Sequence, residues 1–170
     1  METYTFRREM RPRPWITVLC LASIAGLVAI DQAVKQFIAA NFEGRDIPLL
    51  GDFMHICYVR NTGAAFSILE GRTVLLAVIT AIMIIACIVL LIRGLPRGGV
   101  GKAALVLIAA GGIGNLIDRI ARGYVVDYLY PKFINFAIFN IADCCVVIGA
   151  IIICVYLILN EKNAKSRTGF

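Results

Sequence analysis

Charge is scarce in this sequence. Asp, Glu, Lys and Arg make up 16% of its 170 residues, whereas hydrophobic residues make up 60%, and the mean hydropathy is +0.84. An ordinary soluble domain carries about 25% charged residues, so this composition excludes a typical soluble protein and indicates an integral membrane protein. The length suits one compact bundle of helices, and we expect a single membrane domain over residues 1–170.

Histidine and paired-cysteine motifs are also scarce. The one histidine, His55, has no companions at metal-ligand spacing, and neither CxxC nor HExxH occurs. These gaps argue against a metal centre and a Ser/His/Asp triad, and we expect His55 to be a surface or loop residue. Five of the six cysteines fall inside apolar runs, where a thiol packs as a small hydrophobic group. We therefore expect no metal, no cofactor and no disulfide framework.

Basic residues are present in excess but do not cluster. The formal net charge is +6, yet the basic residues flank apolar runs and form no dense tract. This distribution favours contact with lipid headgroups over binding of nucleic acid.

Four apolar runs dominate the chain, at about residues 15–38, 73–92, 103–120 and 141–159. Each is close to the roughly 20 residues that cross a bilayer as a helix. The first run continues into Asp31 and Lys35 and not into a small-residue cleavage site, so we interpret it as a retained span and not as a signal peptide. The sequence predicts a mainly α, integral membrane fold, a bundle of four transmembrane helices without internal repeats.

The two longer connections are predicted to lie outside the cytoplasm, at about residues 41–72 and 122–140. The first contains Gly, Pro and Asp turn signals and the β-prone run FMHICYV, so we expect a small β-containing element between the first two spans. With both termini on one side of the membrane, that side carries ten of the 17 basic residues. The positive-inside rule places both termini in the cytoplasm.

Polar residues gather at the outer ends of the spans. They are Asp31 and Lys35 in the first span, Asn115, Asp118 and Arg119 in the third, Asn140 and Asp143 at the start of the fourth, and Asp127 in the connection before it. The second span carries no charge at all. Because ionisable groups in a membrane are costly and usually functional, this segregation indicates a site at the outer leaflet.

Two interpretations of these residues stay open at this point. Asp31 and Lys35 lie four residues apart and can pair, Arg119 can cap its own helix or pair with Asp118, and Asn140 can cap the fourth helix with Asp143 in its first turn. All of these pairs and caps could serve only to hold the helix ends together. Alternatively, Asp127 and Asp143 form a carboxylate pair that shares a proton and activates water, as in aspartic proteases.

A small proton or cation transporter is the competing function for the same carboxylates. The charge-free second span and the lack of inverted repeats argue against it. A purely structural assembly protein would not need two unpartnered carboxylates at one depth.

Five motifs occur in an informative order: DQAVK at 31–35, RNTGAAFS at 60–67, GGIGNLIDR at 111–119, VVDY at 125–128 and FNIAD at 139–143. In these motifs the chain resembles the lipoprotein signal peptidase (signal peptidase II) family, the four-span aspartyl proteases of bacterial membranes. The resemblance covers about residues 15–159. Small departures are Tyr128, where phenylalanine is common, and Cys144 with Cys145 after the second aspartate.

The resemblance implies a function and a set of site residues. Asp127 and Asp143 would be catalytic, and Asp31, Lys35, Asn61, Gly63, Asn115, Arg119 and Asn140 would line or brace the site. The family removes signal peptides from diacylglyceryl-modified prolipoproteins and cleaves just before the lipidated cysteine. The expected partners are these substrates and membrane lipids, and the expected location is the bacterial cell membrane, with the active site at the outer leaflet. We expect the protein to be a monomer.

Overall fold

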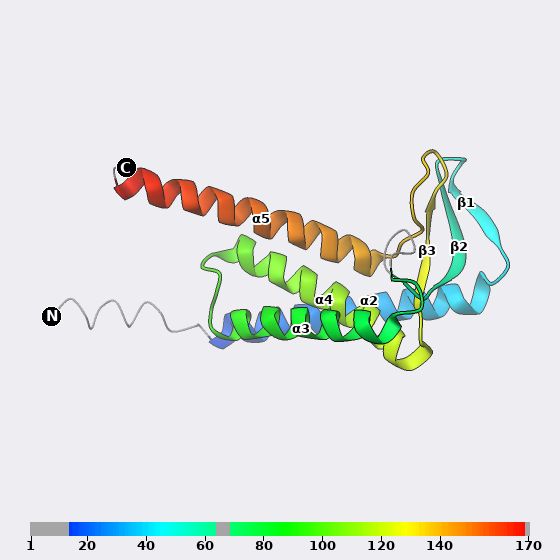
Figure 1. Cartoon of the computed structure of the whole chain (residues 1–170), viewed down its shortest axis with the longest axis horizontal. Coiled ribbons are helices and arrows are strands. Elements are labelled where there is room, and N and C mark those ends of the chain that lie inside the picture. The colour runs from blue at the N-terminus through cyan, green and yellow to red at the C-terminus, as the bar shows by residue number, and fades with distance from the viewer. Residues whose placement is uncertain (1–13, 64–68, 169–170) are drawn as a thin grey trace.

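The structure is a computed structural model and describes residues 14–63 and 69–168. It contains four long helices, α2 (Pro14–Asn41), α3 (Thr73–Ile92), α4 (Gly99–Arg122) and α5 (Ile141–Thr168), which run along the long axis of the molecule (Figure 1). Each is long and apolar enough to cross a membrane. The predicted bundle of four spans is confirmed. Three of the helices continue beyond the predicted apolar runs, because helical hydrogen bonding does not stop where polar residues begin.

Helix α4 is the centre of the bundle and packs against the other three helices. Its approach to α5 is close because glycines lie at the crossing. A Cβ at Gly149 would lie 2.8 Å from the backbone oxygen of Ala104, and a Cβ at Gly111 would clash with the backbone oxygen of Ala142. Small residues at a membrane helix interface allow this contact between backbones. Gly111, the first glycine of the GGIGNLIDR motif, is therefore one of the residues that let α5 approach α4 closely.

The outward faces of α3 and α5 are apolar and uncovered. Val74, Ile82 and Ile151 each expose more than half of their surface. A contiguous apolar surface of this kind suits contact with lipid. The four helices and this surface describe a protein that crosses the membrane several times.

A three-stranded antiparallel sheet completes the fold, with strand order β1–β2–β3. Its strands are β1 (Asp46–Leu50), β2 (Met54–Asn61) and β3 (Val125–Pro131). The expected β element between the first two spans is confirmed, but a third strand from the second connection was not predicted. Strand β3 pairs with β2 at positions such as Val59 and Asp127, which are far apart in sequence, so local patterns do not reveal the pairing.

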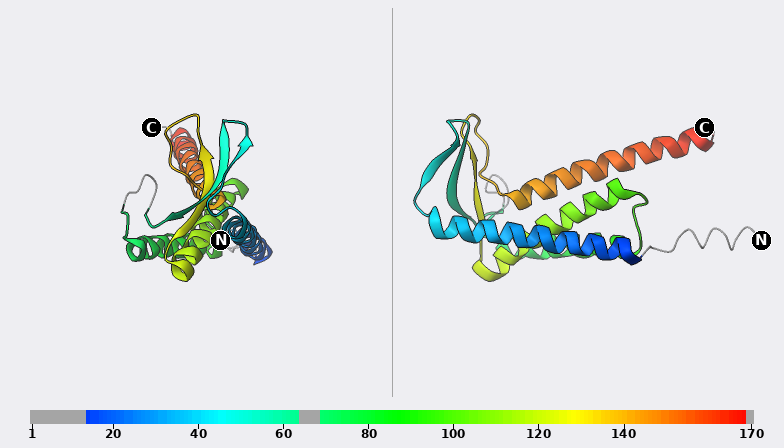
Figure 2. Two further views of the ribbon diagram at one scale, coloured as in Figure 1. Left: turned by 90° about the vertical axis from the view of Figure 1, so that its right-hand side faces the viewer. Right: turned by 180° about the vertical axis from the view of Figure 1, so that it is seen from behind.

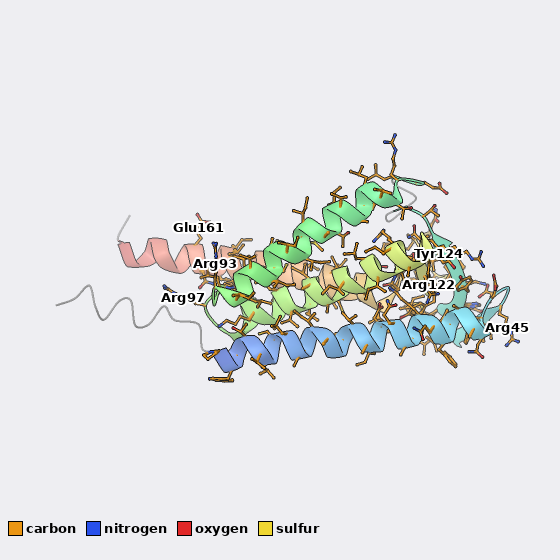
Figure 3. All side chains as sticks on the ribbon, turned by 90° about the horizontal axis from the view of Figure 1, so that it is seen from below. Arg45, Arg93, Arg97, Arg122, Tyr124 and Glu161 are labelled. Atoms are coloured by element: carbon orange, nitrogen blue, oxygen red, sulfur yellow. The ribbon has the colours of Figure 1, made fainter. Side chains whose placement is uncertain are left out.

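The sheet lies at one end of the helix bundle (Figures 1 and 2). It rests on the end of α2 through a buried cluster of Ile38, Val126 and Tyr128. The start of α2, the α3–α4 connection and the end of α5 lie at the opposite end (Figure 2). Arg93 and Arg97 are at this opposite end, whereas Arg45 and Arg122 are at the sheet end (Figure 3).

His55 corrects one expectation. It lies on β2 and is only 7% exposed, because alternate residues of this strand face inward. Its Nδ1 is 2.5 Å from Asp46 Oδ1, and Lys132 Nζ lies 2.7 Å from the other oxygen of Asp46. His55 therefore joins β1 to β2 and is not a surface residue.

Two predicted features fall outside the described residues. Residues 64–67 of the RNTGAAFS motif are one, and the basic residues before residue 14 are the other.

Candidate active site

Asp127 lies in the middle of β3 and is 1% exposed. Two side-chain amides donate to it: Asn61 Nδ2 to Oδ2 and Asn140 Nδ2 to Oδ1, each over 2.7 Å. Burial and, secondly, the charge of Asp143 raise the pKa of Asp127 from 3.8 to about 7. The amide donors oppose this shift but do not cancel it. Near neutral pH, Asp127 can therefore hold a proton.

Asp143 lies in the first turn of α5, and Asn140 precedes that helix as its N-cap. The two residues bind each other reciprocally. The Asp143 backbone N–H donates to Asn140 Oδ1 over 2.9 Å, and the Asn140 backbone N–H donates to Asp143 Oδ2 over 3.1 Å. This is the capping-box arrangement, so the predicted cap is confirmed. Because Asn140 also binds Asp127, one residue holds both carboxylates.

Asn115 supplies the second donor to Asp143. Its Nδ2 donates to Asp143 Oδ1 over 2.7 Å, while its Oδ1 accepts from Lys35 Nζ over 2.8 Å and from Asn140 Nδ2 over 3.2 Å. All four oxygens of Asp127 and Asp143 thus accept a hydrogen bond from an asparagine side chain or from the asparagine backbone.

Lys35 is completely buried and lies behind this site. Its ammonium contacts Asp31 Oδ2 at 3.0 Å and Asp118 Oδ2 at 3.2 Å, which confirms the predicted pairing of Asp31 with Lys35. Together with Asn115, these contacts use all three N–H groups of the ammonium. Arg122 Nε lies 3.5 Å from the other oxygen of Asp118. Two cations thus face Asp31 and Asp118, while Asp127 and Asp143 have none in direct contact among the described residues.

Arg119 connects the helices to the end of β2. Its Nη2 donates to the backbone oxygen of Gly63 over 3.3 Å, and the Gly63 N–H donates to Asn61 Oδ1 over 2.8 Å. The turn at residues 61–63 thereby orients the Asn61 amide toward Asp127. The suggested pairing of Arg119 with Asp118 is wrong, because Asp118 faces Lys35 and Arg122 instead.

Two cavities meet at Asp127. The larger, here called the membrane-side cavity, has a volume of about 580 Å³ and reaches between α3, α4 and α5, where Leu76, Met83 and Val146 line it. The smaller, the sheet-side cavity, has a volume of about 370 Å³ and is lined by residues of β2, the turn after it and the segment after β3. Both share Asn61, Asp127 and residues 136–138, and Asp143 lines the larger one.

The structure brings all nine predicted site residues into one connected set. Asp118 was not among the predicted site residues, although it belongs to this set. It shares Lys35 with Asp31 and accepts a hydrogen bond from the Val126 backbone N–H over 3.2 Å. Its position one helical turn after Asn115 was the available signal. Tyr128, whose hydroxyl accepts from the Ile141 N–H over 3.3 Å, and the cavity-lining segment 135–138 had no such signal.

Comparison with known proteins agrees with this geometry. The family model described as signal peptidase (SPase) II matches residues 23–159. The lipoprotein signal peptidase of Enterococcus faecalis is 44% identical over 140 residues, which cover 82% of this chain and 87% of that protein. The lipoprotein signal peptidase of Streptococcus pneumoniae is 38% identical over 162 residues, which cover 92% of this chain and 100% of that protein.

Solved structures agree as well. One, described as a bacterial membrane enzyme, superposes with a TM-score of 0.79 at 33% identity and covers 85% of this chain and 90% of that chain. A second structure with the same description has a TM-score of 0.73 at 34% identity and covers 82% and 92%. These matches do not support the alternative hypothesis of a proton or cation transporter. The chain belongs to the signal peptidase II family, the aspartic proteases that cleave signal peptides from prolipoproteins.

Proposed function

We propose that Asp127 and Asp143 are the catalytic pair with which this enzyme removes signal peptides from diacylglyceryl-modified prolipoproteins, just before the lipidated cysteine. The observation that carries the proposal is the position of Asn140, which binds both carboxylates where they face a cavity between the spans.

The two carboxylates have different environments and so can take different roles. Asp127, with its pKa raised to about 7, holds a proton and donates it to the carbonyl oxygen of the scissile bond. Asp143, bound by the Asn115 amide and the Asn140 N–H, is the base that takes a proton from the attacking water. The water oxygen bonds to the carbonyl carbon. Collapse of the tetrahedral intermediate breaks the C–N bond, and the amine leaves with a proton from Asp143. One hydroxyl of the intermediate returns its proton to Asp127 as the new carboxyl group forms.

The remaining site residues position this pair. Asn61 and Asn140 orient Asp127, and Gly63 and Arg119 hold the turn that carries Asn61. Lys35 and Asp31 brace Asn115 from behind. We expect each of these residues to act through the two aspartates and not on the substrate directly.

The membrane-side cavity suits a lipid-modified substrate. Its walls come from α3, α4 and α5 and are mostly apolar, and it ends at the two aspartates. Acyl chains and the apolar signal segment can occupy it while they stay in the membrane, and water enters from the sheet end.

The proposed orientation places both termini in the cytoplasm and the sheet with the active site at the outer leaflet of the bacterial cell membrane. Arg93 and Arg97 lie at the end opposite the sheet (Figure 3), where the positive-inside rule expects basic residues. We further propose that residues 1–170 act as one membrane domain and as a monomer.

The test is cleavage of a purified diacylglyceryl-modified prolipoprotein by the wild type and by Asp127→Asn and Asp143→Asn. Each asparagine variant should lose about 10²- to 10⁴-fold or more of kcat/KM, as expected when an acid or base is removed. Asp52→Asn, an exposed carboxylate outside both cavities, is the matched control and should keep full activity. Near-normal cleavage by either dyad variant would remove that residue from the catalytic pair.

The absence of a cofactor stays a prediction. Activity should persist in excess chelator. Loss that is restored by a divalent metal would contradict the two-aspartate mechanism.

A further inference from the structure

The mechanism above places no part of the substrate in the sheet-side cavity, yet this cavity opens onto the same aspartate. Its lining includes Arg60, Thr62, Glu70 and Asn135 and no residue of a membrane-spanning helix. The membrane-side cavity, by contrast, is lined largely by such helices. A substrate peptide that passes Asp127 from the membrane-side cavity into the sheet-side cavity therefore moves from a largely apolar to a more polar environment.

The substrate makes the same transition at its scissile bond. On one side lie the apolar signal segment and the lipid chains, and on the other lies a polar chain that has to leave the membrane. This correspondence rests on the proposed function. We propose that the sheet-side cavity binds the residues that follow the lipidated cysteine, and that Glu70 selects for a basic side chain among them.

The charges in the cavity favour a basic side chain in the bound peptide. The Arg60 guanidinium already has partners within the protein. Its Nη2 lies 2.7 Å from Glu43 Oε1, and its Cζ lies 5.6 Å from the ring centroid of Tyr58 and 5.4 Å from that of Tyr124. Glu70 is exposed, and no described residue forms an ion pair with it. Besides Asp127, which the proposed mechanism uses as the acid, the carboxylate that lines this cavity is that of Glu70, and it is available to a bound peptide.

The segment at residues 136–138 supplies backbone for the same peptide. It borders both cavities and leads into Phe139, which pairs with Leu129 of β3. Among the described residues, no backbone–backbone hydrogen bond uses Ala137 or Ile138. An extended peptide that lies across both cavities can form hydrogen bonds with the backbone of Ala137 and Ile138, as in strand addition.

Charge selectivity is the first test. Three prolipoprotein substrates carry Lys, Gln or Glu two and three residues after the lipidated cysteine and are otherwise identical. The wild type should cleave the Lys substrate about two- to fivefold faster in kcat/KM than the Glu substrate, the range expected of an exposed ion pair. Glu70→Gln should remove this ratio and Glu70→Lys should invert it.

Asp52→Lys is the matched control, because it makes the same charge change on an exposed residue outside both cavities. It should keep the wild-type ratio. An equal ratio in the wild type and Glu70→Lys would overturn the role of Glu70. The readout is a ratio within each variant, so it does not depend on overall activity. If instead the dyad variants cleave all three substrates normally, the proposed function fails and not this inference alone.

Photocrosslinking tests the direction of the peptide. The Asp127→Asn variant, used to hold uncleaved substrate, is mixed with substrates that carry a photoreactive phenylalanine analogue on either side of the cysteine. A probe two residues after the cysteine should label peptides with residues 59–63 or 135–138. A probe before the cysteine should label α3 or α5. The reverse pattern would overturn the assignment of the two cavities.

Discussion

Lys35 and Asp143 bind opposite ends of the Asn115 carboxamide. The ammonium donates to Oδ1 over 2.8 Å, and Nδ2 donates to Asp143 over 2.7 Å. An ammonium can only donate hydrogen bonds, so it fixes which end of the amide faces it. Rotation of the amide would set its NH₂ against the ammonium and its oxygen against the carboxylate. The buried lysine therefore determines that Asp143 receives a donor.

Removal of the buried cation should destabilise the protein strongly. Lys35→Met leaves the carboxylates of Asp31 and Asp118 without their shared partner, and loss of one member of a buried pair costs about 3–5 kcal/mol. Thermal unfolding in detergent would measure this loss. The double variant Lys35→Met/Asp31→Asn should recover part of it, because it also removes one uncompensated charge. A double variant no more stable than the single one would contradict this account.

Asn140 combines a structural and a functional role that substitution can separate. Asn140→Ser keeps an oxygen that can cap α5 but loses the amide that donates to Asp127. Because the lost amide leaves buried acceptors without their donor, we expect this variant to lose about 1–3 kcal/mol of unfolding free energy, while kcat falls about 10- to 100-fold. Asn140→Ala should lose both cap and activity. Equal activity of Asn140→Ser and the wild type would show that the amide is dispensable.

The raised pKa of Asp127 predicts the pH dependence of cleavage. Since the proposed acid must carry its proton, kcat/KM should fall as pH rises through about 7. Bound substrate excludes more water and favours the neutral carboxyl, so the corresponding limb of kcat should lie at higher pH. These limbs report the carboxylate pair and not one residue alone. A kcat/KM that rises steadily to pH 9 would contradict the assignment of Asp127 as the acid.

The same shift predicts a pH-dependent stability. The folded-state pKa of Asp127, about 7, exceeds its ordinary value of 3.8, so the folded protein binds more protons than the unfolded chain between these values. Its stability therefore falls as pH rises across this interval, by at most about 1.4 kcal/mol per pH unit, and the effect is complete above pH 7. Asp127→Asn cannot titrate there, so the wild type should lose stability relative to this variant between pH 5 and 7.

Unfolding of both proteins at pH 5, 6, 7 and 8 measures this difference. Asp52→Asn is the control and should follow the slope of the wild type. A constant difference between the wild type and Asp127→Asn over this range would show that the pKa of Asp127 is not raised in the folded protein.

Glycines at the α4–α5 crossing should not tolerate even one methyl group. Gly149→Ala places a Cβ within 2.8 Å of backbone and side-chain atoms of α4, and overpacking of this kind costs about 1–3 kcal/mol. Gly111→Ala clashes with Ala142, next to Asp143, so it should also reduce activity. Gly26→Ala on α2 is the matched control. It meets no atom within 4 Å, and the higher helix propensity of alanine should leave stability unchanged or increase it by up to about 1 kcal/mol.

The sequence by itself determined the features that depend on local patterns. Apolar runs of bilayer length predicted the four helices, spacing four residues apart predicted the pair of Asp31 and Lys35, and residues 140–143 predicted the cap of α5. The concentration of polar residues at one end of the spans indicated where the site would lie. Each of these inferences needs only the geometry of one helix and the cost of charge in lipid.

Tertiary structure decided which carboxylates lie beside a buried cation and which are held by amides alone. Asp31 and Asp118 share Lys35, whereas Asp127 is surrounded by amides. The sequence could not make this distinction, because it depends on contacts between residues of different spans and strands. It also could not show that β3 would pair with β2 and that Asp127, on β3, would be buried. That burial, set by packing and not by any local pattern, raises the pKa of Asp127 and separates its proposed role from that of Asp143.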